Sequence, residues 1–244
     1  RTLASQMMSG NEDQKKWIGY KDKNIHHLPF PYPWDISEYE SEKYLKASLS
    51  KLKKKIDLKK DICGVMIETF QGWGALFYPK KYIKKLSEIC KKNDILITFD
   101  EMQAGFSRTG KNFGFQHYDI TPDLICCGKG MGGGVPLSGV IGRADLLDLP
   151  EIGNMSSTNS ANPISCSAGL AVIEEIQKKN LTKETKIKGE ILHRELNKIA
   201  TLRKNLFKVY GKGLIAAMIF EKNIPNLEQK IKYFVERCIE DGLL

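Results

Sequence analysis

The stretch DLICCGKGMGGGVPLSGVIGR, residues 123–143, places a single lysine, Lys129, within a run of glycines. Its mostly apolar beginning, DLICC (123–127), predicts a strand that ends just before the lysine, and LSGVIGR (137–143) predicts another strand. In open parallel sheets, ligands bind outside the carboxyl ends of the strands. We therefore expect Lys129 to lie in a functional loop.

Three known functions of a lysine among glycines could explain this loop. A Walker phosphate loop needs GxxxxGK and then Ser or Thr, but Gly130 follows Lys129 and no glycine lies five positions before Gly128. Gly128, Gly130 and Gly133 match the dinucleotide fingerprint GxGxxG. That fingerprint needs a helix to begin at the glycines, whereas Pro136 and a further strand follow here. A lysine that reacts through its amine remains.

The rest of the chain predicts how this loop is held. ICGVMIET (62–69) and ILITF (95–99) predict two strands, the first of them buried. Between them, PKKYIKKLSEICKKN (79–93) predicts a helix with Pro79 in its first turn, closed by Asn93 in a left-handed conformation. Strands that alternate with helices indicate an α/β fold, with a mainly parallel sheet flanked by helices.

The pattern changes toward the C-terminus. A helix is expected from Asn162-Pro163 onward, and a charged helix around residues 182–200. NLFKVYGKGLIAAMIF (205–220) then predicts two strands joined by glycines. We therefore divide the chain into a large domain, residues 1–190, and the beginning of a smaller α+β domain, residues 191–244.

Composition limits the class of protein. Of the 244 residues, 41% are hydrophobic and 27% are charged, which is typical of a globular protein, and no apolar run approaches the ~20 residues of a membrane span. The net charge of +9 comes mostly from dispersed lysines, as in KLKKKIDLKK (51–60), where Leu49, Leu52 and Ile56 have helical spacing. No nucleic-acid motif accompanies them, so we expect a solvated helix face and neither a nucleic-acid nor a membrane partner.

The cysteines and the N-terminal region add two expectations. The six cysteines contain no CxxC and no zinc-type spacing with histidine, so we expect no metal site, buried reduced thiols and a cytoplasmic location. The first forty residues, which include LPFPYPWD (28–35), predict an extended surface segment.

One cleft can hold both Lys129 and an acidic partner. Asp100 follows the strand expected at 95–99, just as Lys129 follows the strand expected at 123–127. A lysine can form a Schiff base and an aspartate can hold a protonated ring nitrogen, a pair that pyridoxal phosphate uses. Flanking glycines let the backbone approach a bulky cofactor. On spacing alone, a solvated lysine in a glycine loop explains the pattern equally well.

The surrounding sequence resembles the class III, or ω-, aminotransferases. The likeness is carried by ITFDEMQAGFSRTGKNFGFQHYDITPDLICCGKGMGGGVPLSGVIGR (97–143) and extends from Arg1 to about Glu175. It implies the type I pyridoxal-phosphate fold of aspartate aminotransferase and a homodimer. The family's phosphate loop lies upstream of the matched region and a later substrate arginine lies downstream, so the likeness indicates the middle of a longer enzyme.

The resemblance also implies roles for single residues. Lys129 corresponds to the lysine that holds pyridoxal 5'-phosphate covalently, and Asp100 to the aspartate that pairs with the ring nitrogen. Gln103 corresponds to a residue near the phenolic oxygen of the cofactor. Thr158, in MSSTNSANP, corresponds to a threonine that reaches the phosphate of the neighbouring subunit's cofactor.

Two further segments bear on cofactor and substrate. In ETFQGWGALFYP (68–79), Glu68, which we expect to bind the cofactor, matches the family. Trp73 stands where many members carry a glutamate that gates an arginine, so we expect Trp73 to wall the substrate pocket or to be an ordinary buried aromatic. Arg1 corresponds to an arginine that binds a substrate carboxylate, for which a planar guanidinium is suited.

The implied function is an aminotransferase that moves an amino group from an ω-amino acid to a 2-oxo acid in a ping-pong cycle. A 4-aminobutyrate-like donor is expected first, and acetylornithine, ornithine, diaminobutyrate or an amine donor to pyruvate stay open. Lys129 is expected to carry the proton, so none of the four histidines is required. Two alternatives stay open. One is an aminomutase or a dialkylglycine-type decarboxylase that uses the same cofactor, and the other is a non-catalytic relative of the fold.

Overall fold

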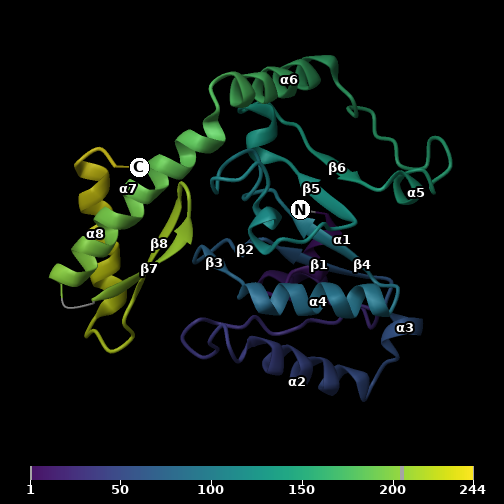
Figure 1. Cartoon of the computed structure of the whole chain (residues 1–244), viewed down its shortest axis with the longest axis horizontal. Coiled ribbons are helices and arrows are strands. Elements are labelled where there is room, and N and C mark those ends of the chain that lie inside the picture. Colours follow the sequence, from purple (N-terminus) through teal and green to yellow (C-terminus); the bar gives the residue numbers. More distant parts are fainter. Residues whose placement is uncertain (1, 204–205, 244) are drawn as a thin grey trace.

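The chain folds around a four-stranded sheet, as the computed structural model, which describes residues 2–203 and 206–243, shows (Figure 1). The strands are β1 (Gly64–Glu68), β4 (Leu96–Asp100), β5 (Leu124–Cys127) and β6 (Gly139–Gly142), in the order β1-β4-β5-β6. β1, β4 and β5 are parallel, and β6 is antiparallel to β5. The expected α/β fold with a mainly parallel sheet is confirmed.

The four strands lie within two residues of the ends predicted from the sequence. The direction of β6 has a simple cause. Between Cys127 and Gly139 the chain forms only the 3-10 turn η3 (Lys129–Gly132). A parallel neighbour needs a crossover of a dozen or more residues, so this short connection reverses the chain instead.

Helices cover the sheet in successive layers. α4 (Lys80–Lys92) packs on β4, and α2 (Ser41–Lys53) packs on the far side of α4 (Figure 1). The apolar stripe of α4 supplies much of the core, because its buried positions recur at helical spacing. The buried residues of this core are Leu45, Leu49, Leu58, Tyr82, Ile83, Leu86, Cys90, Ile95, Ile97, Phe99, Tyr118, Ile125 and Cys127.

The C-terminal part lies beside the carboxyl ends of the parallel strands (Figure 1). It consists of α6 (Pro163–Lys178), α7 (Leu181–Leu202), the antiparallel hairpin of β7 (Phe207–Lys212) and β8 (Ile215–Phe220), and α8 (Leu227–Glu240). Both expected helices and the expected strand pair are confirmed. The division at residues 190 and 191 falls within α7, which is continuous, and stays a prediction.

Short elements complete the part of the chain that the structure describes. They are α1 (Leu3–Met8), η1 (Asp13–Ile18), α3 (Leu58–Asp61), β2 (Phe70–Gln71), β3 (Leu76–Phe77), η2 (Gly114–Tyr118) and α5 (Ala144–Leu147). Across these described residues, no helix combines the length and the apolar character needed to cross a bilayer. Nor do they contain a group of three or more His, Cys, Asp or Glu side chains arranged to hold a metal ion.

Several local expectations were wrong. The first forty residues are not wholly extended, because α1 and η1 form there. The helix expected through residues 51–60 is broken, since α3 begins anew after Asp57, whose Oδ1 accepts a hydrogen bond from Lys59 N at 2.9 Å. Asn93 has φ of −106°, and Asp94, with φ of 57°, takes the left-handed conformation instead.

The expected burial of the thiols was also wrong in part. Cys90 and Cys127 are buried in the core, whereas Cys63 and Cys166 are exposed. Cys63 lies just before the edge strand β1, where the described residues provide a neighbour on one side only.

Candidate active site

The carboxyl ends of the three parallel strands bring the predicted site residues to one edge of the sheet. Glu68, the last residue of β1, pairs in register with Asp100, the last residue of β4, and Asp100 pairs with Cys126 of β5. Lys129 follows β5 within three residues. Asp100 is half-buried, and its Oδ1 accepts a hydrogen bond from Met102 N at 2.9 Å.

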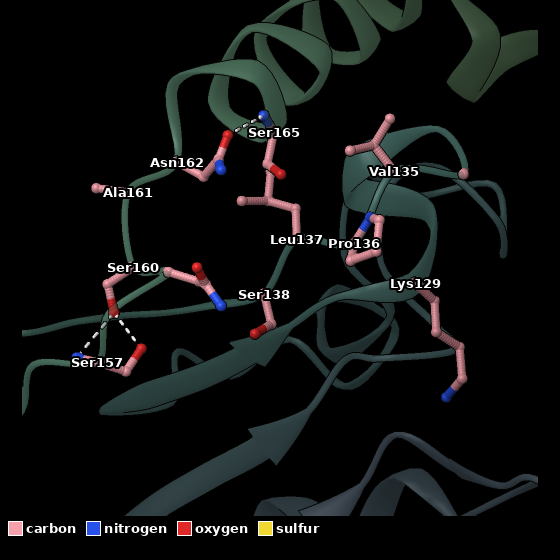
Figure 2. A pocket seen from close by; sticks show the side chains of 12 residues that line it. Lys129, Val135, Pro136, Leu137, Ser138, Ser157, Ser160, Ala161, Asn162 and Ser165 are labelled. Carbon is pink, nitrogen blue, oxygen red and sulfur yellow. Dashed lines mark hydrogen bonds between the residues drawn. The ribbon is translucent and has the colours of Figure 1, made fainter.

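Lys129 lies on the wall of a cavity of about 580 Å³ and is exposed (Figure 2). Its φ of 43° is left-handed, a conformation that costs energy for a residue with a Cβ and that clusters at functional sites. The preceding Gly128 cannot be replaced without rearrangement, because its Cβ would lie 2.4 Å from Met102 Sδ. Close packing therefore fixes the backbone from which the amine projects.

A polar segment forms the opposite wall of this cavity. Lys129 and residues 134–138 lie on one side, and Ser157, residues 159–162 and Ser165 lie on the other (Figure 2). Asn162 caps α6, because its Oδ1 accepts hydrogen bonds from the backbone N–H groups of the first turn. The cavity thus combines hydroxyl and amide groups with the N-terminal end of a helix, which favours anions, while the amine of Lys129 points away from the serines and Asn162 (Figure 2).

Gln103 and Trp73 are brought to the same region by a close contact. A Cβ on Gly72 would lie 2.4 Å from Gln103 Nε2, so the amide packs directly against the backbone before Trp73. Trp73 is 59% exposed, which contradicts the alternative of an ordinary buried aromatic. Its ring centroid lies 6.4 Å from that of Trp34 and 6.2 Å from that of Tyr32.

The remaining predicted residues stand apart. Thr158 is exposed in the segment that precedes Asn162, and it does not line the cavity, although its neighbours Ser157 and Asn159 do. Arg1 lies outside the described residues.

Sequence reasoning missed Glu101, which follows Asp100 directly. Glu101 is 0% exposed, and its carboxylate accepts hydrogen bonds from Thr69 Oγ1 at 2.5 Å and from the backbone N–H groups of Gly114 and Phe115, each at 2.7 Å. Burial raises the pKa of Glu101, and these hydrogen bonds oppose the rise. The one signal in the sequence was the adjacent acid pair in FDEMQ, but it does not reveal which acid is buried.

Comparison with known proteins identifies the family. The family model for class-III aminotransferases matches residues 1–244. The chain belongs to the class-III aminotransferase family. Family members use pyridoxal phosphate.

Individual relatives give a narrower view. The chain is similar to an acetylornithine aminotransferase of Prochlorococcus marinus, with 37% identity over 77% of the chain and 45% of the relative. It is also similar to a probable 4-aminobutyrate aminotransferase of Bacillus subtilis, with 32% identity over 78% and 45%. A leucine/methionine racemase of Thermococcus litoralis is 33% identical over 91% and 52%. The chain spans about half the length of the curated relatives it matches.

Solved structures support the same assignment. An aminotransferase of Bacillus anthracis overlays with a TM-score of 0.87 at 25% identity and covers 100% of the chain and 57% of that protein. The type I pyridoxal-phosphate transferase fold expected from the sequence is therefore confirmed.

The residues at the sheet edge fit the cofactor of this family. Ligand pockets typically have volumes of about 300–1,000 Å³, a range that includes the cavity at Lys129. Open space lies beside Gly134, where a Cβ would meet no atom within 4 Å. Asp100, on the neighbouring strand, does not line this cavity but carries a carboxylate, the kind of group that can pair with a protonated ring nitrogen.

Proposed function

We propose that this chain is part of a pyridoxal-phosphate-dependent aminotransferase that moves an amino group from an ω-amino acid to a 2-oxo acid in a ping-pong cycle. One observation carries the proposal. Lys129 stands at the wall of a ligand-sized cavity just past β5, and Asp100 ends the adjacent parallel strand β4. Membership of the class-III family supports the same reaction.

The chain's own residues then have defined tasks. When bound, the cofactor supplies an aldehyde that takes up the amino group and a ring that draws electrons from the substrate. Nζ of Lys129 holds the cofactor between turnovers, takes a proton from the substrate carbon and returns it at the end of the half-reaction. The negative carboxylate of Asp100 keeps a proton on the ring nitrogen. Gln103 and Glu68, at the same edge, complete the cofactor contacts.

The donor is proposed to be 4-aminobutyrate-like. A relative named for 4-aminobutyrate and several named for acetylornithine support a donor whose amine is distant from a carboxylate. Trp73 is proposed as a wall of the substrate pocket, because it is exposed and directly follows the glycine that packs on Gln103. Arg1 is proposed as the group that binds the donor carboxylate.

The assembly and location belong to the same proposal. The enzyme is a homodimer in the cytoplasm, and Thr158 contributes to the phosphate site of the neighbouring subunit. The exposed position of Thr158, before a capped helix N-terminus, supports a contact with an anion outside its own fold.

A half-reaction measurement tests the proposed function. The full-length protein is loaded with pyridoxal phosphate and mixed with 4-aminobutyrate, N-acetylornithine or L-ornithine, while the visible spectrum reports conversion of the cofactor from its aldehyde to its amine form. We expect Lys129→Ala to lower this rate by at least about a thousandfold, since nucleophile and proton carrier are both lost. Lys91→Ala, an exposed lysine of α4, serves as the matched control.

Product analysis separates the rival reactions. Release of carbon dioxide, migration of the amine within one molecule or inversion of leucine without amino transfer would contradict the proposed transamination. Inversion of leucine is included because one relative is named a leucine/methionine racemase.

A further inference from the structure

Glu101 is a buried acid with no task in the proposed reaction. It lies at the end of β4, next to Asp100, and none of its surface is exposed to solvent. An isolated charge in such a place is costly, and buried carboxylates persist when hydrogen bonds satisfy them. Glu101 has three donors within 2.7 Å, so the fold is built to hold this carboxylate.

The donors come from separate parts of the chain. Thr69 directly follows β1, and Gly114 and Phe115 belong to η2. The backbone N–H of Glu101 also donates to the carbonyl oxygen of Cys126 in β5 at 2.9 Å. Glu101 therefore ties together the ends of β1, β4 and β5, the strands that carry Glu68, Asp100 and the Lys129 loop.

Packing around this junction leaves little space. A Cβ on Gly114 would lie 2.6 Å from Thr69 Cγ2 and 2.7 Å from Ala104 Cβ, so only a glycine lets η2 approach the carboxylate. Tyr118 extends the network, because its hydroxyl donates to Thr69 O at 2.5 Å and accepts from Tyr78 N at 3.0 Å. Loss of one member therefore leaves other polar groups buried without partners.

We propose that Glu101 is the positioning residue of this site, which holds the end of β4 so that Asp100 meets the ring nitrogen of the cofactor. The inference rests on the proposed function. Glu101 itself touches neither cofactor nor substrate in this scheme, and it acts through the backbone that it shares with Asp100.

The test uses the full-length enzyme and two variants. Glu101→Gln keeps the size of the side chain but turns an amide NH₂ toward a backbone N–H group, of Gly114 or Phe115, that can only donate. Thr69→Val removes one donor without changing the acid. We expect both to weaken pyridoxal-phosphate binding about tenfold or more. We also expect the pH midpoint of the visible absorbance of the bound cofactor to shift by about one unit, because Asp100 no longer holds its position.

Two control variants separate positioning from general destabilisation. Thr69→Ser retains the hydroxyl and should keep both the affinity and the pH midpoint near those of the wild type. Ser107→Ala removes a different buried hydroxyl, which lies 2.6 Å from Thr182 Oγ1, and should lower the melting temperature without moving the absorbance midpoint.

The outcomes distinguish this proposal from the proposed function. If Glu101→Gln and Thr69→Val only lower the melting temperature, as Ser107→Ala does, the positioning role is overturned while the enzyme assignment stands. If Glu101→Gln does not fold, Thr69→Val alone decides between these results. A wild-type protein that binds no pyridoxal phosphate overturns both proposals.

Discussion

At the scale of single residues, His117 shows how packing sets a charge. Its Nε2 lies 3.0 Å from Thr109 Oγ1, and its ring meets that of Phe77 edge-on at 5.6 Å. Burial lowers the pKa of His117 to about 4, and the nearby Lys212 and Lys111 lower it further. The imidazole is therefore neutral at pH 7. It lies close to the C-terminal hairpin, which carries Lys212.

This shift predicts how stability depends on pH. The folded pKa lies below the ordinary 6.5, so the unfolded chain binds more protons between about pH 6.5 and 4. The contribution of His117 is complete above that window and is lost as the pH falls through it. We expect His117→Asn to flatten the fall in melting temperature between pH 7 and 4, measured by calorimetry. The exposed His27→Asn is the control, and an unchanged slope in His117→Asn would contradict the assignment.

The same scale shows what sequence reasoning can find. The position of Lys129 and Asp100 at one edge of the sheet was predicted from the sequence, because each lies at or just past the end of an apolar strand and parallel strands end together. Their roles come from the family resemblance and stay predictions. Glu101 was not found, because its burial depends on Thr69 and Gly114, which are distant in sequence. A positioning residue is defined by such long-range contacts, whereas a ligand-binding residue is often marked by its place at a strand end.

At the scale of elements, two glycines join α7 to the β7–β8 hairpin. A Cβ on Gly189 would lie 2.5 Å from Gly213 Cα, which belongs to the turn between the strands. Gly213 has φ of 57°, and a Cβ added there would lie 2.5 Å from the carbonyl carbon of Thr109, in the loop that follows β4. Helix, hairpin and loop thus meet through backbone atoms.

This contact predicts that a larger residue at Gly189 destabilises the fold. We expect Gly189→Ala to lower the free energy of unfolding by about 1–3 kcal/mol, although alanine favours helices, because the added methyl forces the hairpin away. Urea denaturation measures the change. Gly10→Ala, where a Cβ meets no atom within 4 Å, is the control. A stabilised Gly189→Ala would show that the hairpin is not held against α7.

Elements with a strong periodic pattern were predicted well, and short ones were not. The apolar stripe of α4 and the apolar runs of β4 and β5 can be recognised in the sequence, because the side chains that face the core must be apolar. β2 and β3 have two residues each, too few to show alternation. Phe70 and Phe77, which are paired across the two strands, stack with their ring centroids 5.1 Å apart.

At the scale of the whole molecule, the region around Thr158 differs from the core. Large apolar side chains are exposed at the end of α5, on the segment between α5 and α6 and on α6 itself. They are Leu147, Leu149, Ile152, Met155, Ile164, Leu170 and Ile173. Contiguous exposed apolar surface is typical of interaction sites. It supports the proposal that Thr158 acts across a subunit interface, which sequence patterns alone cannot locate.

Mixing two inactive variants tests this arrangement. If Thr158 serves the neighbouring subunit, a hybrid of Lys129→Ala and Thr158→Ala chains contains one site with both residues intact and one with neither. We expect equal mixing of the unfolded full-length chains, followed by refolding, to restore about a quarter of the wild-type sites, because half of the dimers are hybrids and each has one intact site.

The control mixes Lys129→Ala with Lys129→Met, a pair that leaves no intact site in any dimer. Half-reaction rates and bound pyridoxal phosphate are measured before and after mixing. If Thr158 instead serves its own chain, every site in a hybrid lacks one residue and mixing restores nothing. Recovery therefore depends only on which chain's threonine reaches the phosphate, since each variant carries its defect in a different component of the site.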